Sequence, residues 1–218
     1  MALRAVDAVV LVLGASSGIR SELVRVWSRV TALGLPCLLF LNELDKDGIS
    51  PDEVVALCQR DLGIMPLPMS LPFGKGAQLE GVMDLLQQSL ITSRTETPTF
   101  QQLPIPENER ALVADAWKRV QEGVAEHDDR LLEQYLAVGE LTLEGLTNGL
   151  RLGVQAGTIV PLYCGSAIKN IGIVPLLNAI VGLLPSPMNR AAKTPLEGLR
   201  PDTGEAVSRR AVHEDPFS

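Results

Sequence analysis

Two short polar segments each follow a run of apolar residues and carry groups that can bind a ligand. The segment Asn42–Asp45 follows the apolar run 37–41, and Gly165–Ala167 follows the apolar run 158–164. The first segment offers an amide and two carboxylates, and the second offers a hydroxyl and backbone N–H groups. A carboxylate can accept two hydrogen bonds from a planar pair of donors. We predict a binding site from these two segments and assign no catalytic residue.

A sheet is needed to bring the two segments together. Continuous runs of leucine and β-branched residues predict strands that are buried on both faces, and helix-period segments separate them. The predicted strands are 8–13, 37–41 and 158–164, and the predicted helices are 21–33, 51–62 and 172–184. Strands of this kind with crossover helices form right-handed parallel units, in which the residues after each strand share one edge. The predicted fold class is therefore α/β, with a partial doubly wound parallel sheet.

The middle of the chain differs from this pattern. Prolines interrupt 64–103, where MPLPMSLPF indicates an extended edge strand, and 107–137 is predicted helical with Leu112 and Leu136 on its apolar face. The segment 107–145 holds 10 acidic and 4 basic residues, a net charge of −6, which is consistent either with a docking surface or with a solvated helix exterior. We interpret 64–157 as an α+β insertion, and 188–218 as a linker with the start of another domain.

Composition excludes several classes of protein. The chain has 218 residues, is 46% hydrophobic and carries a net charge of −7, which excludes disorder throughout. No apolar run approaches the roughly 18 residues that a membrane span needs, so no membrane partner is expected. Basic residues gather only in the tail, which argues against autonomous nucleic-acid binding. Three distant cysteines without a C-x-x-C spacing predict a reducing, cytoplasmic location and no metal site.

Two glycine-containing turns suggest other sites and fail on detail. The segment 14–19, GASSGI, is similar to the dinucleotide turn of short-chain dehydrogenases, but Arg20 stands where that turn needs a third glycine, and no Tyr-x-x-x-Lys pair is present. Gly74-Lys75-Gly76 lacks the G-x-x-x-x-G-K-[ST] frame of a phosphate loop. We interpret these segments as a strand-to-helix loop and a solvated turn.

The order of the motifs resembles one family. Asn42–Asp45 resembles the N-K-x-D guanine motif of GTP-binding proteins, and 164–167 with Lys169, Asn170 and Gly172 resembles their second base-recognition loop. Along nearly the whole chain the segments resemble translation elongation factor G, the ribosomal translocation GTPase, in the same order. They are LRAVDAVVLVLGASSGI, PCLLFLNELD, LPFGKGAQLEGVMDLL, DDRLLEQYL, IVPLYCGSAIKNIGIVPLLNAIVGLLPSP and the terminal EDPFS.

The resemblance implies a P-loop GTPase-like fold and roles for five residues. Residues 1–63 and 158–187 would form part of the GTP-binding domain, around the insertion 64–157. Asp45 would select guanine, because its carboxylate can accept hydrogen bonds from the N1 and N2 donors. Asn42 would brace the loop, and the backbone N–H of Ala167, behind Ser166, would meet guanine O6. Glu43 departs from the family, which usually has lysine there with its stem over the base.

The phosphate loop, the first switch and the Asp-x-x-Gly-His segment would lie before Met1, so the chain is expected to be a fragment without Mg²⁺ ligands. Two charge-assisted hydrogen bonds supply about 3–6 kcal/mol, against an association cost of about 4–15 kcal/mol. GTP or GDP binding is therefore expected to be weak or absent, and GTP hydrolysis by this chain alone is not expected.

Partners follow from the same resemblance. The ribosome and its stalk protein are the expected partners, and the alternative function is a non-catalytic relic or a stalk interaction module. The family's first strand would pair beside 8–13, so its loss predicts an apolar edge and a tendency to aggregate.

Overall fold

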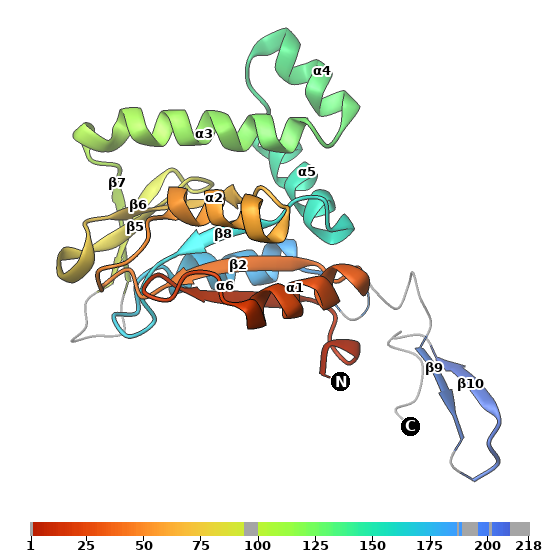
Figure 1. Ribbon diagram of the computed structural model, residues 1–218. Helices are drawn as coiled ribbons and strands as arrows, with labels where there is room; N and C mark the ends of the chain where they lie inside the picture. The colour runs from red at the N-terminus through yellow and green to blue at the C-terminus, as the bar shows by residue number, and fades with distance from the viewer. Residues whose placement is uncertain (1, 94–99, 187, 189–195, 201, 210–218) are drawn as a thin grey trace.

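The structure contains a four-stranded parallel sheet with helices on both faces (Figure 1). The structure is a computed structural model that describes residues 2–93, 100–186, 188, 196–200 and 202–209. The strand order is β1-β2-β8-β3, and all pairs are parallel. The elements are β1 (Val9–Gly14), α1 (Ser21–Ala32), β2 (Cys37–Asn42), α2 (Pro51–Leu62), β3 (Leu67–Pro68), β8 (Pro161–Cys164) and α6 (Ile173–Leu183). The predicted α/β fold class is confirmed.

Side-chain alternation along the strands explains the two helical layers. Leu39 and Leu41 of β2 pack in one apolar cluster with Trp27 of α1 and Val54 of α2. Leu38 and Phe40 point the other way, into a cluster with α6. Helix α2 begins with a capping box, because the Ser50 hydroxyl accepts from the Glu53 N–H while the Glu53 carboxylate accepts from the Ser50 N–H. Strands β2 and β8 are therefore buried on both faces, as their apolar sequences predict. Strand β1, which we also predicted to be buried on both faces, is buried on one face only, since Val12 is 55% exposed.

A second, antiparallel sheet of order β4-β5-β6-β7 follows, with three helices beside it. Its strands are β4 (Ser70–Phe73), β5 (Gly81–Asp84), β6 (Ser89–Ser93) and β7 (Phe100–Pro104), and the helices are α3 (Arg110–Ala125), α4 (Asp129–Val138) and α5 (Leu143–Ala156). Short 3₁₀ helices are η1 (Ala2–Arg4), η2 (Gly76–Gln78) and η3 (Glu107–Glu109). The segment predicted as one edge strand forms two, since β3 lies at the edge of the parallel sheet and β4 at the edge of the antiparallel one.

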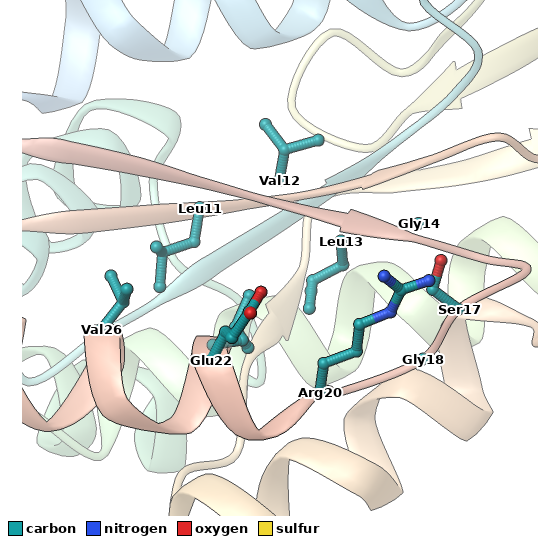
Figure 2. Close-up of a pocket in the computed structure, with 10 residues that line it drawn as sticks. Leu11, Val12, Leu13, Gly14, Ser17, Gly18, Arg20, Glu22 and Val26 are labelled. Carbon is teal, nitrogen blue, oxygen red and sulfur yellow. The ribbon is translucent and has the colours of Figure 1, made fainter.

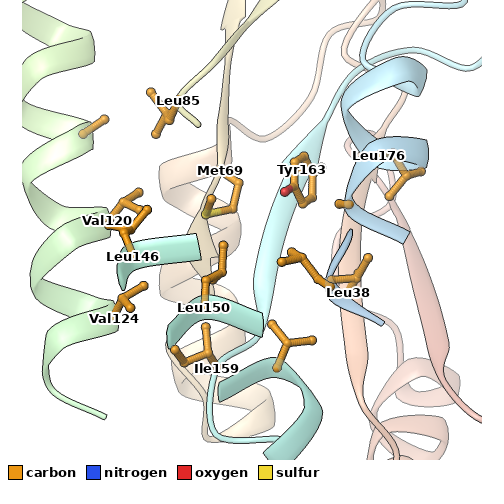
Figure 3. Close-up of a cluster of buried hydrophobic side chains, with 14 of the residues drawn as sticks. Leu38, Met69, Leu85, Val120, Val124, Leu146, Leu150, Ile159, Tyr163 and Leu176 are labelled. Carbon is orange, nitrogen blue, oxygen red and sulfur yellow. The ribbon is translucent and has the colours of Figure 1, made fainter. Parts of the chain in front are cut away.

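One apolar core joins the two sheets. Figure 3 shows Leu38 of β2 and Leu176 of α6 in the same cluster as Val120 of α3, with Met69 and Tyr163 between them. Met69 and Leu38 are completely buried. The second sheet and its helices therefore pack against the parallel sheet, and the loops at their junction are held by a shared core.

Two apolar residues that we predicted to face the core are exposed. Leu112 of α3 is 47% exposed and Leu136 of α4 is 76% exposed. The α3 face that packs inward is formed by Val113, Ala116, Val120 and Val124, and α4 contacts the core only through partly buried residues. The break that we predicted at 127–129 is confirmed, since Asp128 caps the N-terminus of α4.

The last described residues form a hairpin of their own, β9 (Leu196–Leu199) with β10 (Ala206–Arg209). The terminal EDPFS segment, Pro187 and Arg210 lie outside the described residues.

Candidate functional site

The two polar turns predicted from the sequence lie side by side at the carboxyl ends of β2 and β8. Asn42 Oδ1 accepts a hydrogen bond from the backbone N–H of Ala167 at 2.9 Å. The Leu44 N–H donates to the Gly165 carbonyl at 3.1 Å, and the Gly165 N–H donates to the Leu41 carbonyl at 2.9 Å. The 42–47 turn and the 165–172 turn are therefore one structural unit.

The 165–172 turn closes tightly on itself. Ser166 and Ile171 exchange two backbone hydrogen bonds of 3.0 and 2.9 Å. A Cβ atom added to Gly165 would lie 2.1 Å from the Ile171 carbonyl oxygen, so only glycine fits there. The buried Ser166 hydroxyl accepts from the Lys169 N–H at 3.3 Å. This network presents the Ala167 N–H at the surface of the turn.

Backbone strain marks both turns. Glu43 has φ +70° and Asn170 has φ +55°, and the remaining non-glycine residue of positive φ in the described ranges is Gln88. Left-handed backbone costs of order 1–3 kcal/mol at such residues and often accompanies functional sites. The strain supports a functional interpretation of these turns.

Glu43, which stands where the resembling family usually has lysine, is part of a hydrogen-bonded cluster. Its carboxylate accepts from Lys46 Nζ at 2.8 Å and from the Ser16 hydroxyl at 2.6 Å. The hydrogen bond from Lys46 is the main reason that the pKa of Glu43 lies below its ordinary value, and Ser16 adds to it. Lys46 therefore offsets the negative charge that Glu43 brings to the turn.

The carboxylate of Asp45 is available to a ligand. Asp45 is partly exposed, and in the part of the chain that the structure describes it makes no hydrogen bond or ion pair. The Ala167 N–H, in contrast, is already bonded to Asn42, so a ligand oxygen must share or displace that bond. The Asp45 carboxylate and the Ala167 N–H therefore lie on the same pair of turns, and a ligand oxygen can compete with Asn42 for that N–H.

The loop after β1 completes the same edge of the sheet. The Ala15 N–H donates to the Asn42 carbonyl at 2.8 Å, and the Ile49 N–H donates to the Ala15 carbonyl at 3.0 Å. A Cβ atom on Gly48 would lie 2.6 Å from the Ala15 carbonyl, so this packing requires a glycine at 48. The predicted structural role of the 14–19 loop fits its position against the 42–47 turn.

An open groove of about 330 Å³ runs along β1 beside α1 (Figure 2). Leu11 and Leu13 point from β1 toward α1, and Arg20 lies near Ser17 at the end of the strand. Val12 points to the opposite side of the strand. Asn42 and Ala167 do not line this groove, but Gly14, which does, pairs with Asn42 in the sheet and lies beside the Glu43 carboxylate.

The structure brings together all five residues that we predicted from the sequence as site residues, because Asn42, Glu43 and Asp45 share one turn, and Ser166 and Ala167 share the turn bonded to it. Their binding role stays a prediction. Three contacts of these turns were not predicted, namely Glu43 with Lys46, Glu43 with Ser16, and Lys169 with Ala77, although Lys169 itself belongs to the predicted loop. The i,i+3 spacing of Glu43 and Lys46 was a usable signal for the first of these, whereas the other two contacts are long-range.

Two further findings concern the described residues. They contain no group of three or more His, Cys, Asp or Glu side chains that could hold a metal ion. No helix among them is long and apolar enough to cross a membrane.

The parallel sheet, its helices and the two turns define a mixed α/β domain with a P-loop GTPase-like fold. The family model described as the elongation factor Tu GTP binding domain matches residues 1–186. The chain belongs to this family and is a GTP-binding domain of the translational GTPase type.

A solved structure has the same fold. A crystal structure of a protein from Thermus thermophilus matches with a TM-score of 0.79 and 29% sequence identity. The match covers 95% of this chain and 32% of that one, so this chain spans about a third of the length of the protein it matches.

Proposed function

We propose that the chain binds the base of a guanine nucleotide between the 42–47 and 165–172 turns. The observation that supports this most directly is the Asn42–Ala167 hydrogen bond, which joins the two turns beside the free carboxylate of Asp45. Membership in the elongation factor Tu GTP-binding domain family supports the same ligand.

Each site residue has a role in this proposal. The Asp45 carboxylate accepts from the N1 and N2 donors of guanine, a pair that adenine does not have. The Ala167 N–H turns from Asn42 Oδ1 to guanine O6, and Asn42 keeps the two turns in register. Ser166 holds the second turn through its buried hydroxyl.

Contacts to the base alone give weak binding. Two charge-assisted bonds supply about 3–6 kcal/mol against an association cost of about 4–15 kcal/mol. The sequence contains no G-x-x-x-x-G-K-[ST] segment to add phosphate contacts. We therefore propose weak binding by the 218-residue chain, with Mg²⁺ and GTP hydrolysis assigned to none of its residues.

The wider role that we propose is in protein synthesis in the cytoplasm. The sequence resembles elongation factor G, which makes the ribosome the proposed partner and translocation the proposed process. The domain boundaries proposed from that resemblance are 1–63 and 158–187 for the GTP-binding part and 64–157 for the insertion.

A titration of GDP and ADP into the ¹⁵N-labelled chain, into the millimolar range, tests the base site. We expect shifts at Ala167 and Asp45 with GDP and much smaller ones with ADP. Asp45→Asn should abolish the GDP preference, whereas Asp115→Asn on the exposed face of α3 should keep it. Equal response to the two nucleotides, or an unchanged preference in Asp45→Asn, would contradict the proposal.

A second proposed function is binding of the ribosomal stalk protein by the insertion. The exposed Leu136 and Val138 at the end of α4 support it, because neighbouring exposed apolar side chains favour protein contacts. Leu136→Ser with Val138→Ser should weaken binding of purified stalk protein while leaving the GDP response unchanged. Unchanged stalk binding in this double variant would argue against it.

A further inference from the structure

The 165–172 turn bonds to the insertion through the side chain of Lys169, in addition to the 3.0 Å hydrogen bond that the Cys164 N–H, just before the turn, donates to the Ser70 hydroxyl. Lys169 Nζ donates a hydrogen bond of 2.8 Å to the backbone carbonyl of Ala77, which lies 92 residues earlier in the chain. Ala77 belongs to η2, within the GKGAQL segment that we refer to as the 74–79 turn. The sequence predicted only a solvated turn here.

The 74–79 turn is itself rigid. Its N–H groups close it, with Gln78 donating to Lys75 and Leu79 donating to Gly76, each at 3.0 Å. A Cβ atom on Gly74 would lie 2.1 Å from the Gln78 carbonyl, so the turn is tightly wound. Leu79 anchors it in the apolar cluster beneath the parallel sheet. Because this turn is rigid, the Ala77 carbonyl holds the Lys169 ammonium group in one place.

The same turn also lies against the other half of the candidate site. A Cβ atom on Gly76 would be 3.6 Å from a carboxylate oxygen of Asp47, at the end of the 42–47 turn. The 74–79 turn therefore adjoins the 42–47 turn and is hydrogen-bonded to the 165–172 turn. Lys169 is partly buried, and its backbone N–H is bonded to the Ser166 hydroxyl. The position of the Lys169 side chain therefore affects the backbone on both sides of Ala167.

We infer that Lys169 is a positioning residue, which fixes the base-recognition turn to the 74–79 turn of the insertion and so presets the Ala167 N–H for a guanine base. This inference deepens the proposed function and rests on it for the ligand. The attachment itself is a statement about the ligand-free chain. Because of this attachment, the conformational stability of the 74–79 turn and the affinity for the base are thermodynamically coupled.

The test compares amide hydrogen exchange and nucleotide affinity in Lys169→Met, Lys169→Arg and Lys118→Met. Methionine keeps most of the stem and removes the donor, arginine restores a donor, and Lys118 lies exposed on α3. Without nucleotide, Lys169→Met should exchange faster over 165–171, with an unchanged thermal midpoint. Lys169→Arg should restore the slow exchange, and Lys118→Met should match the parent chain.

With GDP, Lys169→Met should bind about three- to tenfold more weakly, the range expected for one net hydrogen bond. Unchanged exchange over 165–171 in Lys169→Met overturns the inference, and a loss of affinity in that case would mean that Lys169 contacts the nucleotide directly. If the parent chain shows no preference for GDP over ADP, the proposed function fails. The exchange result then still decides whether Lys169 holds the turn.

Discussion

Asn42 and Ala167 are 125 residues apart in sequence, and a 2.9 Å hydrogen bond joins the Asn42 side-chain oxygen to the Ala167 backbone N–H. It links the ends of two neighbouring parallel strands, β2 and β8, at the edge where open α/β sheets bind ligands. The bond holds two segments together that carry different parts of the proposed base site.

Asn42→Ala should lower the free energy of unfolding by about 0.5–1 kcal/mol. One net hydrogen bond is lost, and the exposed Ala167 N–H can bond to water instead. The Ala167 amide should exchange faster. Asn148→Ala removes only a local i,i+3 contact on α5, so the urea midpoint of unfolding should stay unchanged or rise slightly. Equal exchange of Ala167 in the parent chain and Asn42→Ala would contradict the bond.

The charge state of Glu43 should depend on Lys46. The pKa of Glu43 lies below its ordinary 4.5 chiefly through the hydrogen bond from Lys46, with Ser16 next. Carboxyl ¹³C shifts followed against pH should therefore show a midpoint below 4.5, which rises in Lys46→Met and rises less in Ser16→Ala. Because the pKa is lowered by folding, the stabilisation from this cluster is complete above about pH 4.5 and is lost as the pH falls through the folded-state pKa. A midpoint that Lys46→Met leaves in place would show that the ion pair does not form.

Glycine should be essential in the second turn. Gly165→Ala places a Cβ atom 2.1 Å from the Ile171 carbonyl, and Gly172→Ala places one at 2.1 Å from the Cys164 carbonyl at a φ of +77°. Each should destabilise the chain by about 2–4 kcal/mol, measured by urea unfolding. Gly182→Ala meets nothing within 4 Å in helix α6 and should be neutral or stabilise by about 0.5–1 kcal/mol. Similar losses in all three variants would refute the close approach.

Strand β1 should drive self-association. In the described part of the chain it pairs with β2 alone, and Val12 on it is 55% exposed. An apolar edge strand is a template for pairing with another chain, and a charge on it opposes that pairing. The 218-residue chain should therefore show concentration-dependent light scattering that Val12→Lys reduces, whereas Val181→Lys, at an exposed site on α6, should reduce it less. A parent chain that stays monodisperse at high concentration would contradict this expectation.

Helix and strand positions followed closely from the pattern of apolar residues. The run 8–13 became β1 (Val9–Gly14), and 51–62 is α2 without change. The predicted strand 158–164 begins only at Pro161, because Thr158 and Ile159 donate to the Gly153 carbonyl and close the end of α5. Residues such as Thr158 and Ile159 can either close a helix or begin a strand, and the periodicity of apolar residues does not distinguish the two.

The exposed Leu112 and Leu136 show where the same pattern fails. Periodicity shows that a helix has an apolar face, and it does not show how much of that face another element covers. Helix α4 contacts α3 and α5 at one end of the molecule, so part of its apolar face stays outside.

The sequence by itself determined which segments form strands and helices, and which residue types stand at the strand ends, because both depend on neighbours along the chain. The tertiary structure decided that Glu43 bonds to Ser16 and Lys46, that Asn42 holds Ala167, and that Lys169 reaches Ala77. Apart from the Glu43–Lys46 pair, these contacts join residues 27 to 125 positions apart. Their geometry arises only when the parallel sheet and the insertion pack around one core, since strand order and loop packing are not encoded in local periodicity.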